Sequence, residues 1–248
     1  MDLYGIIGQP LSHSFSKDYF TIKFSMEEID AKFQLFPIQD VKEIKSLIRE
    51  YPELKGLSVT KPYKKEIMPF LDEIDEEASE IGSVNVIKIN RNGKAPFLKG
   101  YNTDAPGFEN ALVEFLPDMN YKALVLGNGG AAQAVKYALS KLGIDYKIVS
   151  RNPQKGMIAY DQLDEKIISE RNLIINCTPL GMFPNENEDP ALPYQFISNE
   201  HYLYDLIYNP EETQFLKKGY EQGAAIENGL KMFYGQADAA WKKLRIKN

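Results

Sequence analysis

The sequence predicts a two-domain α/β protein. Short apolar runs with strand character alternate with amphipathic helical patterns along the chain. One of these runs, 123–126, leads directly into a glycine-rich turn and then a helical pattern. Between the two halves, Asn102-Thr103-Asp104 begins a connecting helix. We therefore expect one domain at 1–102, a second at 103–228, and a final helix at 229–248.

The composition limits the classes of function. The chain has 248 residues, 44% hydrophobic and 26% charged, which is typical of a soluble globular protein of one or two domains. Its net charge is −6 without a basic stripe, so nucleic acid is not an expected partner. The single Cys177 excludes an internal disulfide, and the two histidines lack metal-ligand spacing. With no secretion signal and no apolar run near ~20 residues, we expect a cytoplasmic protein without membrane or metal partners.

The first domain is expected to be mixed α/β. Apolar residues recur on one helical face within 41–51, whereas Arg91-Asn92-Gly93 is typical of a hairpin turn. The expected strands are 3–7, 32–38, 57–59, 84–89 and 97–101, and the expected helices are 16–29, 41–51, 64–71 and 73–81.

The second domain repeats strand and helix. We expect strands at 123–126, 146–149, 173–176, 202–206 and 225–227, and helices at 106–115, from the glycine turn to Gly143, and at 230–246. The stretch 152–164 has weak periodicity, so no element is assigned to it, and 185–190 is a polar loop. The last helix has one apolar face that by its spacing could pack on either domain, and we expect it to return to the first domain.

The glycine turn predicts a dinucleotide site. A tight turn requires Gly127, close approach of backbone N–H groups to a diphosphate requires Gly129, and close helix–strand packing requires the small Ala132. The start of the following helix also attracts an anion. With Asn128, Gly130 and Ala131, these residues are the candidate contacts of a Rossmann-like domain. A glycine-rich turn without a ligand is the alternative.

The end of the next strand indicates which dinucleotide. Binders of NAD usually have an acidic residue there for the ribose 2′-hydroxyl. This chain has Ser150 and Arg151, with Lys155 just beyond. A hydroxyl and two cations suit a 2′-phosphate, which arginine can bind with two hydrogen bonds, so the expected cofactor is NADP(H). Ordinary solvated surface charge is the alternative.

Four polar clusters are candidates for chemistry. They are the segment 8–16 with hydroxyls at Ser12, Ser14 and Ser16 beside His13; the segment 58–65 with Lys64; Asn85 with Asn102-Thr103-Asp104; and Asn228-Gly229 with Gln236. Each also has a purely structural explanation. Ser14 or Ser16 could cap a helix, Lys64 could be a solvated charge at a helix start, Asp104 could be a first-turn acid and Gln236 could face solvent.

Together the motifs resemble the shikimate dehydrogenase family over essentially the full length. They are GQPLSHSFS, SVTKPYK, SVN, GYNTD, LGNGGAA with SRNPQK, INCTPLGM, YDLIY and NGLKMFYGQA, in the family's order and spacing. The resemblance implies that the first domain and the last helix bind an acid and that the middle domain binds NADP(H).

Roles follow from the resemblance, motif by motif. Ser14 and Ser16, helped by Tyr208, are implied to bind the carboxylate, and Thr60, Asn85 and Gln236 the ring hydroxyls. Lys64 and Asp104 are implied to be the catalytic pair. The residues implied to bind the cofactor phosphates are Gly127, Asn128, Gly129, Gly130, Ala131, Ser150, Arg151 and Lys155. Those implied to lie near the nicotinamide end are Thr178, Leu206 and Gly229.

The implied reaction is the reversible, NADP-dependent reduction of 3-dehydroshikimate to shikimate, in aromatic amino acid and chorismate biosynthesis, by a monomer or homodimer. Two alternatives remain: a quinate/shikimate dehydrogenase with relaxed substrate or NAD use, and a non-catalytic NADP(H)-binding sensor. Three positions depart from the family pattern. Lys17 stands where proline is usual, Ser58 where asparagine is usual, and Asn128 where alanine is usual.

Overall fold

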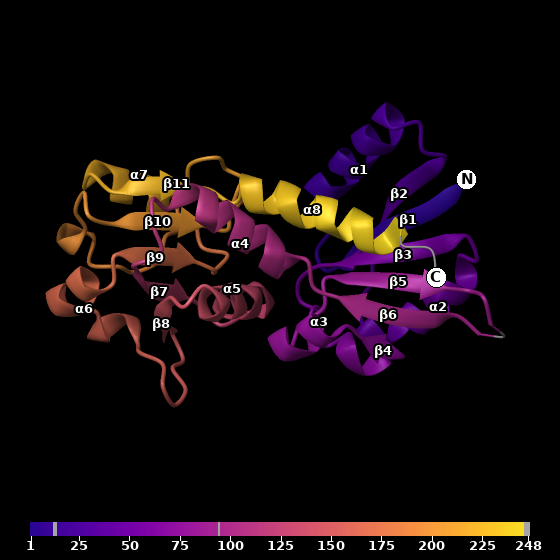
Figure 1. The fold of residues 1–248 in the computed structure, drawn as a ribbon, viewed down its shortest axis with the longest axis horizontal. Coiled ribbons are helices and arrows are strands. Elements are labelled where there is room, and N and C mark those ends of the chain that lie inside the picture. Colours follow the sequence, from indigo (N-terminus) through magenta and orange to yellow (C-terminus); the bar gives the residue numbers. More distant parts are fainter. Residues whose placement is uncertain (12–13, 94, 246–248) are drawn as a thin grey trace. The chain divides into compact units, whose positions relative to one another are not determined.

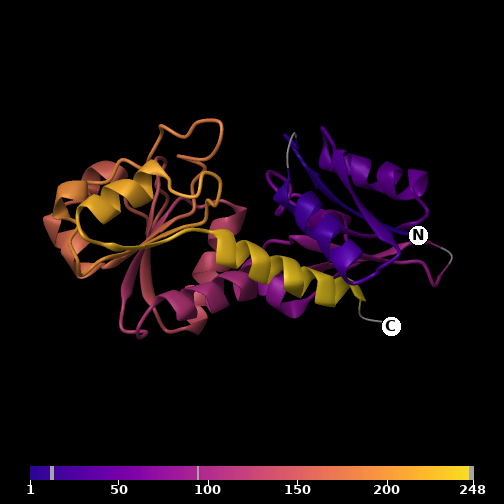
Figure 2. The ribbon, with the colours of Figure 1, turned by 90° about the horizontal axis from the view of Figure 1, so that it is seen from above.

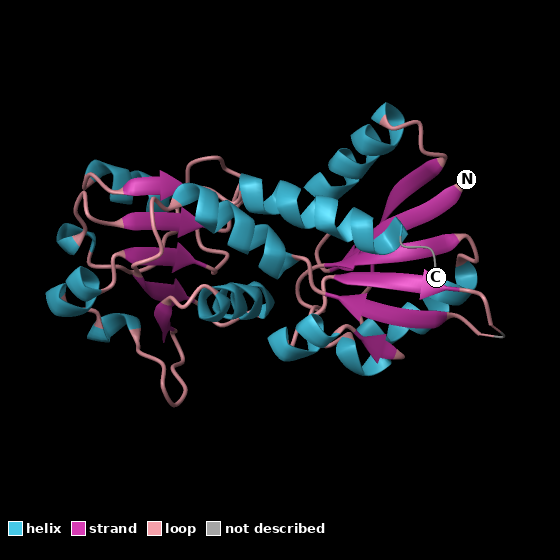
Figure 3. Cartoon of the chain, viewed as in Figure 1, coloured by secondary structure: helices cyan, strands magenta, loops and turns pink. Residues whose placement is uncertain are grey.

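The computed structural model describes residues 1–11, 14–93 and 95–245 (Figure 1). The chain divides into two compact units. Unit 1 is Met1–Thr103 with Ala237–Asn248, and unit 2 is Asp104–Gln236. Each unit is a β-sheet with helices packed on both faces, so the predicted two-domain α/β class is confirmed (Figure 3). Among the described residues, no helix has both the length and the apolar character needed to cross a membrane.

Unit 1 is built on a six-stranded mixed sheet with the order β2-β1-β3-β5-β6-β4. Strand β1 pairs in parallel with β2 and β3, whereas β5 is antiparallel to both β3 and β6. The elements are β1 (Asp2–Gly8), α1 (Phe15–Met26), β2 (Ala31–Pro37), α2 (Ile44–Glu50), β3 (Leu54–Val59), β4 (Glu73–Ile74), α3 (Glu76–Ile81), β5 (Val86–Asn90) and β6 (Phe97–Tyr101).

The central strand β1 shows why both faces of this sheet are covered. Successive side chains of a strand point to opposite faces. Leu3 and Ile7 pack in one apolar cluster with α2 and α3, while Tyr4 and Ile6 pack in another with α1 and the end of the last helix. These four β1 side chains are therefore buried on the two sides of the sheet.

The structure differs from the expected helices at 64–71 and 73–81. Residues 61–67 form turns, and only Met68–Phe70 form a short 3-10 helix. Pro69 explains this, because proline has no N–H to continue an α-helix and disfavours helical geometry in the residue before it. After it, Glu73 and Ile74 pair in parallel with β6, so the helix α3 begins only at Glu76.

Unit 2 has a parallel five-stranded sheet with the order β11-β10-β9-β7-β8 (Figure 1). The chain moves from β7 to β8 on one side and then to β9 on the other, so β7 and β9 flank the point where the strand order reverses. The elements are α4 (Asp104–Phe115), β7 (Lys122–Leu126), α5 (Gly130–Lys141), β8 (Asp145–Val149), α6 (Glu165–Glu170), β9 (Leu173–Asn176), β10 (Tyr202–Asp205), α7 (Gln214–Glu221) and β11 (Ala225–Glu227).

The stretch 152–164, to which no element was assigned, contains no α-helix. Its only regular features are a single parallel bridge from Ile158 to Val149 and a short 3-10 helix at Tyr160–Gln162. The bridge holds the start of the loop against the end of β8, because the Ser150 N–H donates to the Ile158 carbonyl at 2.9 Å. The sequence also did not predict α6 and α7.

The last helix, α8 (Leu230–Arg245), contributes to both units. Met232 belongs to the core of unit 2, and Trp241 and Leu244 belong to the core of unit 1. Figures 1 and 2 both draw α4 alongside the first half of α8. At Gly107 the two helices are so close that a Cβ atom would lie 2.8 Å from the Gln236 backbone nitrogen and 2.9 Å from the Met232 carbonyl oxygen.

A fully buried carboxylate organises the loops that follow β9 and β10. Asp205 accepts hydrogen bonds from Asn176 Nδ2 at 3.1 Å, the Ile207 N–H at 3.0 Å and Thr213 Oγ1 at 2.6 Å. Asn176 in turn accepts from the N–H and the hydroxyl of Thr178. Burial raises the pKa of Asp205 from 3.8 to about 7, although the three donors act in the opposite direction.

We predict that Gly107→Ala destabilises the protein. In an ordinary helix this change stabilises by up to ~1 kcal/mol, but here the new methyl group would clash with the backbone of α8. Overpacking of this kind typically costs about 1–3 kcal/mol. Urea unfolding of the two proteins measures the difference. Ser140→Ala, on the exposed face of α5, is the control, and an unfolding free energy unchanged or raised in Gly107→Ala would contradict the close contact.

We also predict a pH dependence of stability that originates at Asp205. Its pKa is raised in the folded state, so the folded protein holds a proton that the unfolded chain releases between pH 4 and 7. The stability contribution is therefore complete below pH 4 and is lost as the pH rises through about 7. A shift of roughly three units corresponds to about 4 kcal/mol.

The Asp205→Asn variant keeps the side-chain shape and removes this titration. Denaturant unfolding at several pH values between 4 and 8 should show the wild-type free energy of unfolding falling relative to that of the variant. Parallel pH profiles for the two proteins would show that Asp205 has an ordinary pKa.

Candidate functional site

In unit 1, residues predicted to bind the substrate lie at one end of the sheet strands. Strands β1 and β3 end there, and the antiparallel β5 begins there. The Thr60 N–H donates to the Ile7 carbonyl at 3.0 Å, and the Val59 N–H donates to the Asn85 carbonyl at 2.8 Å. A Cβ atom on Gly8 would lie 2.4 Å from Thr60 Cγ2, so the glycine is needed for these loops to approach each other. This edge places Thr60 and Asn85 together.

Lys64 lies at the same edge. It is half-buried in a turn rather than solvated at the start of a helix, and its carbonyl accepts a hydrogen bond from the Val84 N–H at 2.8 Å. Val84 immediately precedes Asn85, so the backbone of Lys64 is tied to the segment that carries the predicted hydroxyl-binding amide. By contrast, the neighbouring Lys65 is exposed.

Asn85 is buried and fixes the segment that leads to Asp104. Its Oδ1 accepts from the Thr103 N–H at 2.7 Å, and its Nδ2 donates to Thr103 Oγ1 at 3.0 Å. Asn102 is held similarly, because its Nδ2 donates to the carbonyl and the hydroxyl oxygen of Ser83, both at 2.9 Å. The polar residues of the SVN and NTD motifs thus bind one another and define the backbone just before Asp104.

The serine cluster lies at the start of α1. Ser14 occupies the N-cap position, but its side chain makes no capping hydrogen bond, so the capping explanation does not account for the hydroxyl. Ser16 is half-buried in the first turn of the same helix. Ser12 and His13 lie outside the described residues, as does Ile246, the expected end of the last helix.

In unit 2, Asp104 is brought towards Gln236. Asp104 is 4% exposed and begins α4, one turn before the contact between Gly107 and Gln236. A first-turn acid serving only the helix dipole is normally exposed to solvent. Tyr208 belongs to the same neighbourhood. Its ring packs on Phe233 of α8 at 5.0 Å, and burial, with the Asp104 charge adding to it, raises the pKa of Tyr208 to about 12.

The glycine turn lies at the point where the strand order reverses, which is where open α/β sheets bind ligands. Gly127 has φ = +96°, a conformation that side chains rarely adopt, and its N–H donates to the Val149 carbonyl at 2.8 Å. A Cβ atom on it would lie 3.1 Å from Thr178 Cγ2. The turns after β7 and β9 are therefore in contact, and Gly127 and Thr178 lie side by side.

The space around Gly129 shows whether this turn has room for a dinucleotide. It is the N-cap of α5 with an ordinary φ of −77°, and a Cβ atom on it would meet no atom within 4 Å. Neither backbone strain nor packing within the protein therefore requires glycine at this position. The open backbone at the start of α5 leaves room for a diphosphate to lie against it, so the residues present fit NADP(H).

The other predicted cofactor residues occupy two loops. Arg151 and Lys155 are exposed beyond β8, and Ser150 Oγ accepts from the Asn152 N–H at 3.2 Å. Tyr160 faces this loop: burial raises the pKa of its phenol to about 12, while the Arg151 charge opposes the rise. Beyond β10, a Cβ atom on Gly229 would lie 2.1 Å from the Leu206 carbonyl oxygen.

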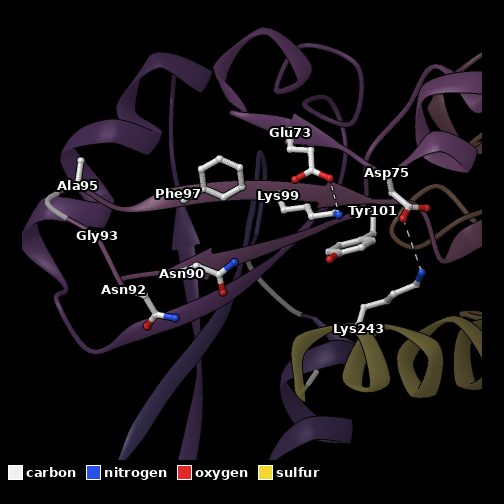
Figure 4. A pocket seen from close by; sticks show the side chains of 10 residues that line it. All are labelled: Glu73, Asp75, Asn90, Asn92, Gly93, Ala95, Phe97, Lys99, Tyr101 and Lys243. Atoms are coloured by element: carbon white, nitrogen blue, oxygen red, sulfur yellow. Dashed lines mark hydrogen bonds and ion pairs between the residues drawn. The ribbon is translucent and has the colours of Figure 1, made fainter. Parts of the chain in front are cut away.

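A surface pocket of unit 1 lies apart from these residues. Its volume is about 650 Å³, and none of the residues predicted for substrate or catalysis lines it. Lys99 and Lys243 approach the Tyr101 ring from within it, and each is paired with an acid, Glu73 and Asp75 respectively (Figure 4). These charges neutralise one another in pairs, so the pocket does not provide the unpaired cation that an acid substrate needs.

Three residues near the predicted site were not predicted from the sequence. Asp205 and Asn176 hold the turn that carries Thr178, and Lys136 of α5 reaches the glycine turn. A signal existed for the first two, because polar residues at the carboxyl ends of β9 and β10 follow buried apolar runs. No comparable signal existed for Lys136, whose position within a helix is typical of a solvated charge.

The comparisons with known proteins agree with the motifs. The family model described as the shikimate dehydrogenase substrate binding domain matches residues 6–87. A shikimate dehydrogenase (NADP(+)) of Carboxydothermus hydrogenoformans is 40% identical, over 97% of this chain and 90% of that protein.

Solved structures show the same similarity. The shikimate dehydrogenase of Aquifex aeolicus has a TM-score of 0.87 with 33% identity, over 99% of this chain and 92% of that one. The shikimate 5-dehydrogenase of Thermus thermophilus, in complex with NADP(H) and shikimate, has a TM-score of 0.86 with 28% identity, over 99% and 94%. Sequence and fold over nearly the whole chain lead to the same conclusion: this protein belongs to the shikimate dehydrogenase family.

Proposed function

We propose that this protein catalyses the reversible reduction of 3-dehydroshikimate to shikimate with NADPH. The observation that carries the proposal is the buried carboxylate of Asp104. It directly follows a segment fixed by Asn85 and lies one helical turn from the contact with Gln236. A buried carboxylate can hold an ammonium group in position and accept a hydrogen bond from a substrate hydroxyl.

In this proposal six polar side chains bind the acid substrate. Ser14 and Ser16 at the start of α1 bind the carboxylate, and the positive end of the helix dipole favours the anion there. Tyr208 helps through its hydroxyl group. Thr60, Asn85 and Gln236 bind the ring hydroxyls, since each offers a side chain that can donate or accept a hydrogen bond.

Unit 2 binds the cofactor. The glycine turn from Gly127 to Ala131 receives the diphosphate, and Ser150, Arg151 and Lys155 receive the 2′-phosphate. Thr178, Leu206 and Gly229 would contact the nicotinamide end of the cofactor. Thr178 lies beside Gly127, and Gly229 lies against Leu206, which supports this assignment. The protein acts in the cytoplasm, as a monomer or a homodimer.

The bound cofactor supplies the hydride for the ring carbonyl. Negative charge develops on the carbonyl oxygen as the hydride arrives, and Lys64 donates a proton to that oxygen. Asp104 orients the ammonium group of Lys64 and accepts a hydrogen bond from a neighbouring substrate hydroxyl. In the reverse direction the same pair removes the proton from the shikimate hydroxyl.

The first test is catalysis by Lys64. Purified wild-type protein should reduce NADP+ with shikimate, and slower turnover with quinate and NAD+ would separate the proposal from a relaxed quinate/shikimate enzyme. Lys64→Ala should lower kcat by about 10²- to 10⁴-fold, the usual contribution of a general acid. Calorimetry should still show binding of shikimate and NADP+. Lys65→Ala, which removes an exposed neighbouring charge, is the matched control.

The outcomes of this test are distinct. No turnover by the wild type with NADP+ binding intact would favour the sensor alternative. Turnover by the wild type with a near-native kcat in Lys64→Ala would remove Lys64 from the chemistry while leaving the activity in place.

The second test concerns the choice of cofactor. Arg151→Ala should weaken NADP+ binding about ten- to a hundredfold, because a hydrogen bond between charged groups is worth ~1.5–3 kcal/mol. Binding of NAD+, which lacks the 2′-phosphate, should stay the same. Titration calorimetry with both cofactors measures the two effects, with Lys147→Ala on the exposed face of β8 as the control. Equal weakening of both cofactors would mean that Arg151 supports the fold or the diphosphate instead.

A further inference from the structure

Asn128 lies in the middle of the glycine turn, and its side chain is hydrogen-bonded to side chains of α5. Its Oδ1 accepts hydrogen bonds from Gln133 Nε2 and from Lys136 Nζ, both at 3.1 Å. Gln133 Nε2 also lies 3.3 Å from the Gly129 carbonyl oxygen, and Asn128 Nδ2 lies 4.0 Å from Met157 Sδ. Alanine, the residue usual in the family at this position, could accept neither of the two bonds that Asn128 Oδ1 accepts.

The consequence is an ammonium group at the turn itself. Lys136 lies in the second turn of α5, yet its side chain extends back past the N-cap residue Gly129 to Asn128. This direction is available because helical side chains lean towards the N-terminus. The Lys136 charge also acts on Cys177, in the turn after β9. Burial and the Asp205 carboxylate raise the pKa of the Cys177 thiol, and the Lys136 ammonium opposes them.

The position is electrostatically unusual. The N-terminal end of a helix carries a partial positive charge, so a cation placed there is disfavoured and an anion is favoured. The Asn128 carboxamide oxygen is one acceptor for this ammonium group. A diphosphate at the start of α5 would interact favourably with both the helix N-terminus and the ammonium group, because it carries two negative charges.

We propose that Lys136 binds the cofactor diphosphate and that Asn128 is the positioning residue that holds its ammonium group at the glycine turn. This inference rests on the proposed role of the turn in binding NADP(H). It differs from the role proposed for Arg151, since the diphosphate is common to NADP and NAD whereas the 2′-phosphate is not.

The experiment separates the phosphates by using fragments. Calorimetric Kd values are measured for NADP+, for ADP-ribose, which has the diphosphate alone, and for adenosine 2′-monophosphate, which has the 2′-phosphate alone. In Lys136→Met the Kd of NADP+ and of ADP-ribose should rise about tenfold or more. The Kd of adenosine 2′-monophosphate should not change. Lys136→Arg, which keeps the charge, should restore most of the affinity for ADP-ribose.

Two further variants complete the design. Lys141→Met removes the same charge from the last turn of α5, where Lys141 pairs with Glu109, and should leave all three Kd values unchanged. Asn128→Ala should weaken ADP-ribose binding severalfold, because the ammonium group loses the acceptor that positions it.

Several results would overturn the inference. An unchanged Kd for ADP-ribose in Lys136→Met would do so, and so would equal losses for ADP-ribose and adenosine 2′-monophosphate, which would indicate a general disturbance of the helix start. If wild-type protein bound none of the three ligands, the proposed cofactor site itself would be wrong. Wild-type binding with no effect of Lys136→Met would reject the role of Lys136 alone.

Discussion

The arrangement of unit 2 depends on the close contact between α4 and α8 at Gly107. Because this residue has no side chain, the backbones of two helices approach to a distance that a single methyl group would prevent. Asp104 and Gln236, the first and last residues of unit 2, lie within about one helical turn of that contact. Tyr208 is joined to them through its ring contact with Phe233 of α8. One glycine therefore determines how three proposed substrate and catalytic residues are brought together.

The cofactor half depends on the parallel sheet in a similar way. Parallel strands bring their carboxyl ends to one edge, and the reversal of strand order between β7 and β9 leaves their two turns next to each other. Gly127 allows the contact with Thr178, and the buried Asp205 fixes the turn from the other side through Asn176. The structure thus uses a buried carboxyl group to hold a loop in place. Three hydrogen-bond donors hold the Asp205 carboxyl group in place. The free energy of burying this group depends on pH, because its pKa is raised by burial.

Some elements were predictable because local patterns determined them. Strands 97–101, 173–176 and 225–227 agree with β6, β9 and β11 residue for residue, and residues typical of turns lie close to the ends of each. The expected helix at 64–71 was wrong because Pro69 outweighs the surrounding helix-forming residues. The strand β4 could not be foreseen, because Glu73 and Ile74 pair with β6, which follows more than twenty residues later in the sequence.

The class of fold, the glycine turn of a dinucleotide domain, the cations that suit a 2′-phosphate and the motifs of the family are all visible in the chain without a structure. These depend on residues that are close together in the chain, where spacing alone defines the geometry. Three further features follow from packing in three dimensions: Lys64 is half-buried in a turn, Asn85 holds Thr103, and Lys136 extends back to Asn128. Burial and side-chain direction depend on what packs around a residue, and those neighbours come from distant parts of the chain or, for Lys136, from the course of a long flexible side chain.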